Sequence, residues 1–265
     1  NIHPLGLPIT YFILPQVWAW KEKRVNTIRK CVDQALCIFP FEQEWFEQRG
    51  VNAHFVGHPF TEFHKPSIDK AAFFNKYSLD QGRPVLVLFP GSRQQEVDRH
   101  LPIFTKVVSL INNDNLQIIV GKVPQVTLGE IPNNWKVEEE DTSLCLEYGT
   151  AVLTASGTAT LQSAVQDIPA VVSYKMSSGS WLLAKNMSKV PFAAMTNLIA
   201  GKQIVPEFLQ GDMTPENLAN AIQPLLSNTA ERKEMLVGYE QVRRTLGMPG
   251  VYERAADAIL SRTFA

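Results

Sequence analysis

The chain has 265 residues, of which 45% are hydrophobic and 19% charged, and its formal net charge is −1. This composition is typical of a soluble globular protein with one large or two smaller domains, and the near-neutral charge argues against a broad nucleic-acid-binding surface. No apolar stretch is long enough to cross a bilayer, and the cysteines Cys31, Cys37 and Cys145 lack the spacing of a zinc site or a disulfide framework.

The opening part of the chain alternates short apolar runs with helical patterns. Strands are predicted at Pro8–Leu14, Gln34–Phe39 and His54–Val56, and helices at Lys21–Cys31 and Phe41–Gln48. This order predicts parallel β-α-β winding. The first strand follows Asn1 almost at once, whereas a complete domain of this kind carries several strands before it. We therefore expect the amino-terminal part of a longer protein to precede this residue.

A polar stretch over Thr61–Lys70 predicts a linker between two domains. We expect 1–62 to be the end of an amino-terminal Rossmann-like domain and 63–246 to be a complete Rossmann-like domain. The last helix, over 247–265, is expected to return to the first domain or to exchange with a partner chain. His58, between a glycine and a proline at this boundary, is interpreted as a hydrogen-bonded structural residue in preference to a catalytic one.

The larger predicted domain continues the alternation of strands and helices. Strands are predicted at 85–89, 117–120, 135–138, 151–153 and 170–174. Helices are predicted in it at 71–77, 94–110, 143–148, 160–166, 180–187, 215–227 and 230–246, and the closing helix at 252–263. The acidic run Glu138–Asp141 is interpreted as a solvated loop, because a cation site needs oxygens that converge from different segments.

Two of these strands run directly into glycine-containing turns that open helices. Pro90–Arg93 follows the first strand, and Ala155–Thr158 follows the fourth. Free backbone N–H groups and the helix dipole favour an anion at such a turn, and arginine is a bidentate partner for phosphate. Each turn alone also fits an ordinary helix cap, and Arg93 alone fits a solvated side chain. Two such turns at the carboxyl ends of strands in one sheet predict a shared phosphate site.

Apolar and basic residues adjoin at Trp18–Arg24. The two tryptophans and the basic cluster could hold an acyl chain or a phosphate, or they could form a packed aromatic corner beside a solvated helix start. The Trp18–Trp20 loop and Trp181–Leu183 could likewise be lipid anchors or buried core. The sequence leaves these alternatives open.

Several motifs in order resemble the lipid-A-disaccharide synthases, which are bacterial GT-B glycosyltransferases. They are PQVWAW at 15–20 with KEKR at 21–24, FPFE at 39–42, VGHP at 56–59, PGSRQQEV at 90–97, ASGTATL at 155–161, NLIAG at 197–201 and VPEFLQ at 205–210. The resemblance runs from about Ile9 to the last helix. It implies an α/β GT-B fold, with two Rossmann-like domains and the active site in the cleft between them.

The resemblance also implies a reaction: inverting transfer of 2,3-diacylglucosamine from its UDP conjugate to 2,3-diacylglucosamine 1-phosphate. It implies no metal or other cofactor and no nucleic-acid partner. The expected place of work is the cytosolic face of the inner membrane, and a homodimer that exchanges carboxy-terminal segments is possible within the family. The catalytic base is expected in the amino-terminal domain, so we assign none here and expect this chain alone to be inactive.

The turns and the resemblance together assign a donor nucleotide site. Its residues are Gly91, Ser92, Arg93, Glu96, Ser156, Gly157, Thr158, Gln162, Asn197 and Glu207. The two turns are expected to stabilise the charge on departing UDP, in place of a cation. Gln162 stands where related sequences usually place a glutamate that accepts hydrogen bonds from the ribose, which predicts a weaker or altered contact.

Two other kinds of function remain open at this point. One is another GT-B enzyme, either the peptidoglycan N-acetylglucosaminyltransferase or a UDP-N-acetylglucosamine 2-epimerase. The other is a non-catalytic module that binds a nucleotide sugar.

Overall fold

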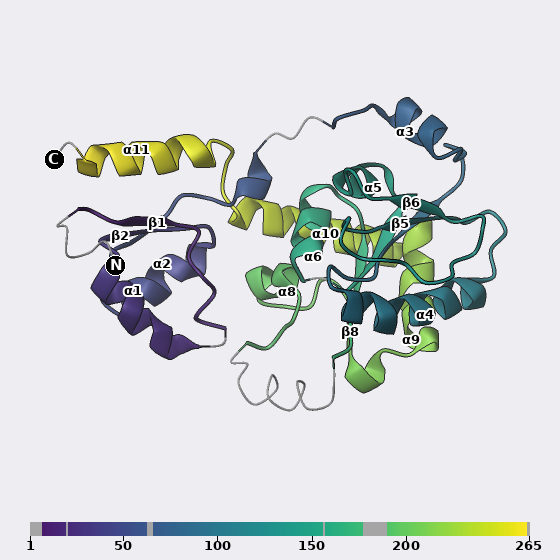
Figure 1. Ribbon diagram of the computed structural model, residues 1–265, viewed down its shortest axis with the longest axis horizontal. Coiled ribbons are helices and arrows are strands. Elements are labelled where there is room, and N and C mark those ends of the chain that lie inside the picture. The colour runs from purple at the N-terminus through teal and green to yellow at the C-terminus, as the bar shows by residue number, and fades with distance from the viewer. Residues whose placement is uncertain (1–6, 20, 63–65, 156, 177–189, 264–265) are drawn as a thin grey trace. The chain divides into compact units, whose positions relative to one another are not determined.

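The computed structural model describes residues 7–19, 21–62, 66–155, 157–176 and 190–263 (Figure 1). The chain divides into two compact units. The first combines 1–64 with 181–191 and 243–265, and the second combines 65–180 with 192–242. Each unit contains a sheet in which every strand pairing is parallel, which confirms the predicted α/β class.

The first unit is built on a three-stranded sheet in the order β1-β2-β3. The strands are β1 (Thr10–Phe12), β2 (Gln34–Cys37) and β3 (Ala53–Phe55). A 3-10 helix, η2 (Glu22–Arg24), leads directly into α1 (Val25–Cys31), and two further helices are α2 (Pro40–Glu47) and α11 (Val251–Thr263).

Strand β2 is buried on both faces, because alternate side chains of a strand point to opposite sides. Ala35 and Cys37 pack in one cluster with residues of α1 and α2. Leu36 packs in another with Val251 and Ala255 of α11. Figure 1 accordingly shows α11 on one side of this sheet and α1 and α2 on the other. The last helix therefore covers the sheet formed by the opening part of the same chain.

Two charged side chains fix the start of α11. The carboxylate of Glu62 accepts hydrogen bonds from the backbone N–H of Gly250 at 3.0 Å and from that of Val251. The guanidinium of Arg254 donates to the carbonyl oxygens of Val56 at 2.9 Å and Met248 at 2.6 Å. Glu62 thus satisfies N–H groups at the helix start that have no partner within the helix, and Arg254 ties the helix to the segments around Val56 and Met248.

The second unit holds a six-stranded sheet in the order β6-β5-β4-β7-β8-β9. The strands are β4 (Val85–Phe89), β5 (Gln117–Gly121), β6 (Lys136–Glu138), β7 (Ala151–Thr154), β8 (Ala170–Tyr174) and β9 (Glu207–Leu209). From β4 the chain moves outward to β6, then returns to lie beside β4 and moves outward the other way. Strands β4 and β7 therefore flank the point where the winding reverses, which is where ligands bind in open α/β sheets.

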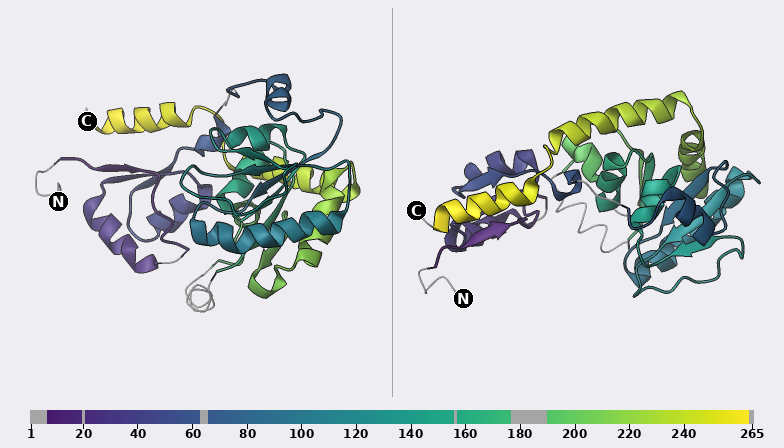
Figure 2. Two further views of the ribbon diagram at one scale, coloured as in Figure 1. Left: turned by 45° about the vertical axis from the view of Figure 1, so that its right-hand side comes forward. Right: turned by 90° about the horizontal axis from the view of Figure 1, so that it is seen from above.

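Helices cover both faces of this sheet (Figure 2). They are α3 (Lys70–Lys76), α4 (Gln94–Ile111), α5 (Ser143–Tyr148), α6 (Gly157–Val165), α8 (Met195–Ala200), α9 (Pro215–Ile222) and α10 (Ala230–Thr245). Helix α4 packs against α9, and α6 packs against α8. Right-handed crossovers that run in opposite directions from the reversal point place α4 and α6 on opposite faces.

Most of the predicted elements are confirmed to within a few residues, but α8 and β9 were not predicted. Helix α8 has six residues and β9 has three. Neither is long enough for a periodic pattern of apolar residues to be recognised in the sequence. The predicted helix over 180–187 lies outside the described residues. Among those described, no helix is long and apolar enough to cross a membrane.

The interpretation of Glu138–Asp141 as a wholly solvated loop is wrong for Glu138, which is buried. Its carboxylate accepts hydrogen bonds from the Tyr77 hydroxyl and from the backbone N–H groups of Glu140 at 2.6 Å and Asp141 at 3.0 Å, and it lies 3.3 Å from the Lys76 ammonium. Burial raises the pKa of Glu138, but the hydrogen bonds outweigh it and hold the pKa below its usual value.

The interpretation of His58 as a hydrogen-bonded structural residue fits its surroundings. The ring is buried, and its Nδ1 accepts a hydrogen bond from the backbone N–H of Phe60 at 3.1 Å. Burial lowers the pKa of His58 to about 4, so the ring is neutral at physiological pH. The backbone N–H of His58 donates to the carbonyl oxygen of Leu246 at 3.0 Å. This hydrogen bond connects the turn at His58 to the segment before α11.

Of the tryptophans considered as lipid anchors, Trp18 is core. Its side chain is buried, and the indole N–H donates to the buried carboxylate of Glu42 at 2.9 Å. Trp20 and 181–183 lie outside the described residues.

We predict that Glu138→Gln lowers the free energy of unfolding by about 1–3 kcal/mol at neutral pH, because it weakens hydrogen bonds to a buried charge. Since folding lowers the pKa of Glu138, its contribution is complete above the unfolded-state pKa of about 4.3 and is lost as the pH falls through the folded-state value. Denaturant titrations should therefore show the wild-type and variant curves converging in acid. Glu130→Gln, at an exposed position in the same unit, is the control, and equal losses in the two variants would contradict the prediction.

Candidate functional site

The two predicted anion-binding turns leave the sheet from neighbouring strands. Strand β4 pairs with β7, with Phe89 opposite Thr154. Directly beyond this pair, the backbone N–H of Ala155 donates to the carbonyl oxygen of Phe89 at 2.9 Å. The starts of α4 and α6 therefore both lie at the carboxyl edge of the sheet, at the point where the winding reverses.

The turn after β4 is closed by a carboxylate of the protein itself. Gly91 has a φ of +140°, and a Cβ there would lie 2.4 Å from the Cβ of Glu96. One oxygen of Glu96 accepts hydrogen bonds from the backbone N–H groups of Ser92 at 3.0 Å and Arg93 at 3.2 Å. These two donors, which the sequence assigns to a phosphate, are thus occupied by a glutamate at the third position of α4.

The other oxygen of Glu96 connects the turn to strand β8. It accepts hydrogen bonds from the Tyr174 hydroxyl at 3.0 Å and from the Arg93 guanidinium at 3.1 Å. Burial raises the pKa of Glu96, but the hydrogen bonds from Ser92, Tyr174 and Arg93 outweigh it, so the pKa lies below its usual value. Burial, together with the Glu96 charge, raises the pKa of Tyr174, which remains a hydrogen-bond donor.

A buried histidine, which the sequence analysis did not identify, makes a second connection. The Nδ1 of His100 lies 2.7 Å from the carbonyl oxygen of Pro90, and its Nε2 accepts a hydrogen bond from the backbone N–H of Lys175 at 3.0 Å. Burial lowers the pKa of His100, so the ring is neutral and Nδ1 carries the proton. The spacing from Glu96, one helical turn along α4, is the sequence signal that could have found it.

Among the predicted site residues that the structure describes, three are exposed at this edge. They are Ser92, Arg93 and Thr158. The Arg93 side chain is 79% exposed, and its ion pair with Glu96 uses one guanidinium nitrogen. The remaining N–H groups of a planar guanidinium are suited to the oxygens of a phosphate.

The buried side chain of Asn197 and the half-buried side chain of Glu207 form a bracket around the start of α8. The side-chain N–H group of Asn197 donates to the Val205 carbonyl at 2.9 Å and to the carboxylate of Glu207 at 2.6 Å. That carboxylate also accepts hydrogen bonds from the backbone N–H groups of Ala193 at 2.8 Å and Ala194 at 2.9 Å. The structure therefore gives both residues internal partners, and they hold the backbone at Ala193 and Ala194.

This bracket bears directly on the second turn. A Cβ on Gly157, the first residue of α6, would lie 2.9 Å from the carbonyl oxygen of Ala193. Only glycine allows so close an approach of two backbones without displacement. Gln162 is half-buried farther along α6, and Ser156 lies outside the described residues. The described residues contain no group of three histidine, cysteine or carboxylate side chains that could hold a metal ion.

Comparisons with known proteins give one consistent family. A family model described as lipid-A-disaccharide synthetase matches residues 3–260. The lipid-A-disaccharide synthase of Myxococcus xanthus is 36% identical over 270 residues, which cover 98% of this chain and 70% of that protein.

Two solved structures share the fold at low sequence identity. MnaA of S. aureus, solved with UDP, is 13% identical with a TM-score of 0.64, covering 99% of this chain and 69% of that one. The calicheamicin glycosyltransferase CalG4 is 15% identical with a TM-score of 0.57, covering 98% of this chain and 68% of that one. These likenesses confirm the predicted GT-B architecture.

We predict that Gly91→Ala destabilises the protein by about 1–3 kcal/mol, the usual cost of forcing a residue with a Cβ into strained backbone geometry. The added methyl group would also push Glu96 away from the N–H groups that it binds. The matched control is Gly129→Ala, because a Cβ there meets nothing within 4 Å. Chemical denaturation of both variants measures the difference, and similar stabilities for the two would refute this account of the turn.

Proposed function

The chain belongs to the lipid-A-disaccharide synthase family, and on that premise we propose that it joins UDP-2,3-diacylglucosamine to 2,3-diacylglucosamine 1-phosphate with inversion and release of UDP. The observation that carries the proposal is the pairing of β4 with β7, which brings the starts of α4 and α6 together at the carboxyl edge of one sheet. The same proposal places the protein at the cytosolic face of the inner membrane, with no metal required.

The Arg93 guanidinium is the principal group for the departing diphosphate. Negative charge grows on UDP as the glycosidic bond breaks, and fixed donors lower the barrier when they are aimed at that charge. Because Glu96 occupies the N–H groups of Ser92 and Arg93, the turn after β4 offers the diphosphate mainly a side chain. The start of α6 offers backbone N–H groups and the positive end of a helix dipole.

Four polar residues with internal hydrogen bonds act by positioning these donors. Glu96 and His100 hold the turn after β4 against the end of β8. Asn197 and Glu207 hold the backbone that faces Gly157. Inversion needs one in-line attack, so a general base must take the proton of the acceptor hydroxyl. We assign no described residue to that role.

We predict that Arg93→Ala weakens UDP binding by about 10- to 100-fold, since a hydrogen bond to a charged group contributes roughly 1.5–3 kcal/mol. Lys106→Ala removes an exposed cation from the same helix and should leave UDP affinity within about twofold. Calorimetric titration of each variant with UDP makes the measurement. An unchanged affinity in Arg93→Ala, or an equal loss in both variants, would count against the assignment.

We predict that Gln162→Glu strengthens UDP binding by about two- to tenfold, because a charged acceptor forms a stronger hydrogen bond with a ribose hydroxyl than an amide does. UDP and pyrophosphate, which lacks the ribose, serve as paired ligands, and only the affinity for UDP should rise. Gln125→Glu, at an exposed position in the same unit, controls for the added charge. A higher affinity for pyrophosphate as well would show that Gln162 does not act through the ribose, and would contradict the prediction.

The complete reaction is tested by a glycosyltransfer assay on the full-length protein with UDP-2,3-diacylglucosamine and 2,3-diacylglucosamine 1-phosphate. Formation of the disaccharide, lost in Arg93→Ala and retained in Lys106→Ala, is the expected result. Turnover with UDP-N-acetylglucosamine in place of the acylated donor would indicate another GT-B enzyme. Tight UDP binding without any transfer would indicate a non-catalytic nucleotide-sugar binding module.

A further inference from the structure

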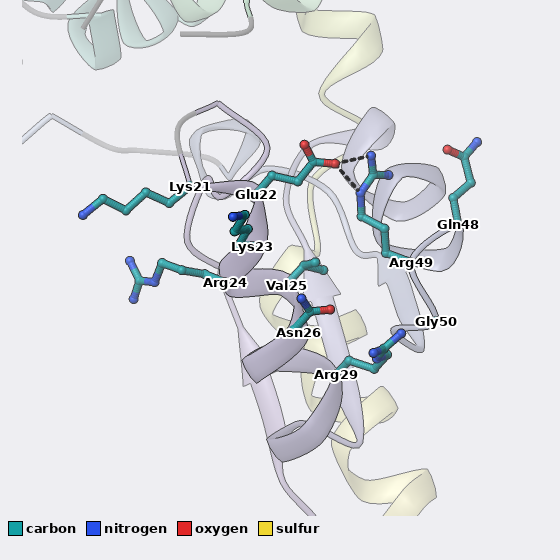
Figure 3. Close-up of a pocket in the computed structure, with 10 residues that line it drawn as sticks. All are labelled: Lys21, Glu22, Lys23, Arg24, Val25, Asn26, Arg29, Gln48, Arg49 and Gly50. Atoms are coloured by element: carbon teal, nitrogen blue, oxygen red, sulfur yellow. Dashed lines mark hydrogen bonds and ion pairs between the residues drawn. The ribbon is translucent and has the colours of Figure 1, made fainter. Parts of the chain in front are cut away.

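The first unit contains a basic pocket of about 850 Å³ between the η2–α1 segment and the turn after α2 (Figure 3). Five cationic side chains and one carboxylate line it, namely Lys21, Lys23, Arg24, Arg29, Arg49 and Glu22. These are five of the chain's 25 lysines and arginines, although the net charge of the whole chain is −1. The donor site proposed above uses none of them.

The single carboxylate of the basic pocket is already paired. Glu22 accepts hydrogen bonds from Nε of Arg49 at 3.0 Å and from its Nη2 at 2.7 Å. The Arg49 guanidinium also lies 3.9 Å from the ring centre of Trp45. Within the described residues no ion pair involves any of the other four cations, and all four side chains are exposed. The pocket therefore holds positive charge that the described part of the protein does not balance.

The walls of the basic pocket are fixed in place. The ion pair of Glu22 with Arg49 joins the start of the helix to the turn after α2, as Figure 3 shows. Val25 on η2–α1 is buried in the core of the unit. Arg29 lies against Gly50, where a Cβ would approach its Cδ to 3.2 Å. The Arg49 guanidinium is held by Glu22 and Trp45, so it loses little freedom when it binds an anion, which favours affinity.

We propose that the basic pocket binds a phosphate monoester. Such a group carries a charge of about −1.5 to −2 at neutral pH and has three acceptor oxygens. It therefore matches a pocket lined by several unpaired cations better than a phosphodiester, which carries a single charge. Arginine contributes a bidentate fork and lysine a point charge to such a site. The phosphate could belong to a sugar 1-phosphate or to the headgroup of a lipid in a membrane.

The first test is a calorimetric titration of the full chain with glucosamine 1-phosphate at low ionic strength. Arg24→Gln combined with Arg29→Gln should weaken binding at least tenfold. Lys30→Gln, which removes an exposed cation on α1 outside the pocket, should change it by less than twofold. An undiminished affinity in the double variant would overturn the proposal, as would an equal loss in Lys30→Gln. Loss of binding in Arg93→Ala, with the double variant unaffected, would likewise overturn it by placing the ligand at the donor site.

The pH dependence gives a second test, because the titrating group is the ligand. A phosphate monoester gains a proton below about pH 6, whereas sulfate keeps its charge. Of the pocket's charged groups, Glu22 is held by Arg49, and the remaining cations are lysines and arginines. Binding of glucosamine 1-phosphate should therefore weaken between neutral pH and about pH 5, while binding of sulfate stays constant. Parallel losses for both anions would overturn the choice of a monoester.

Vesicles distinguish the two sources of the phosphate. Phosphatidylcholine vesicles are compared with vesicles that carry phosphatidate, a monoester, or an equal fraction of phosphatidylglycerol, a diester. Recruitment by phosphatidate that the double variant abolishes supports a membrane source. Binding of glucosamine 1-phosphate without preferential recruitment supports a sugar phosphate. Recruitment by phosphatidylglycerol equal to that by phosphatidate, with no binding of glucosamine 1-phosphate, would overturn the proposal.

The affinity for UDP monitors the donor site separately. The double variant Arg24→Gln with Arg29→Gln should leave this affinity unchanged, even if glycosyl transfer itself is not observed.

Discussion

The candidate donor site depends on one buried carboxylate, that of Glu96. It binds the backbone of the turn after β4, the guanidinium of Arg93 and the hydroxyl of Tyr174 at the end of β8. An ionised carboxylate is costly to bury, and here the hydrogen bonds more than offset that cost, since the pKa of Glu96 falls below its usual value. The turn is compact because its backbone folds around this carboxylate. Gly91 therefore adopts a positive φ, and the Pro90 carbonyl lies within hydrogen-bond distance of His100.

This internal carboxylate changes how an anion can bind. A bare helix start would present its N–H groups to a phosphate, whereas this one presents them to Glu96. A diphosphate near the turn would therefore meet a negative charge as well as a positive one. Arg93 reconciles the two, because a guanidinium can bind Glu96 with one nitrogen and a phosphate with others. A lysine could also contact both anions, but its ammonium lacks the planar fork that binds a phosphate through two parallel N–H groups.

The sequence was a good guide wherever a local pattern determines structure. Apolar runs identified the inner strands of both sheets, and the two glycine turns were correctly placed after β4 and β7. The residue roles were harder to foresee, because they depend on partners far along the chain. Asn197 and Glu207, which the sequence assigns to the nucleotide site, also bind the backbone around α8 and β9. The sequence did not show these partners, because both elements are too short to give a pattern. Glu138 was misjudged because an acidic run looks solvated until Tyr77 is seen beside it.

The two units differ in how their charged side chains are paired. This difference explains why the composition of the whole chain did not reveal either anion site. In the second unit, carboxylates of the protein, those of Glu96 and Glu207, occupy the starts of α4 and α8. The exposed Arg93 therefore acts against a background that is already negative. In the first unit, the one carboxylate of the basic pocket is neutralised by Arg49 and four other cations remain exposed. The net charge of −1 sums over both units and so does not show the local excess of positive charge in the first. Charge recognises a ligand over a distance of about 10 Å or less at physiological salt, so the local arrangement of charges, and not their sum, decides which anions each unit can hold.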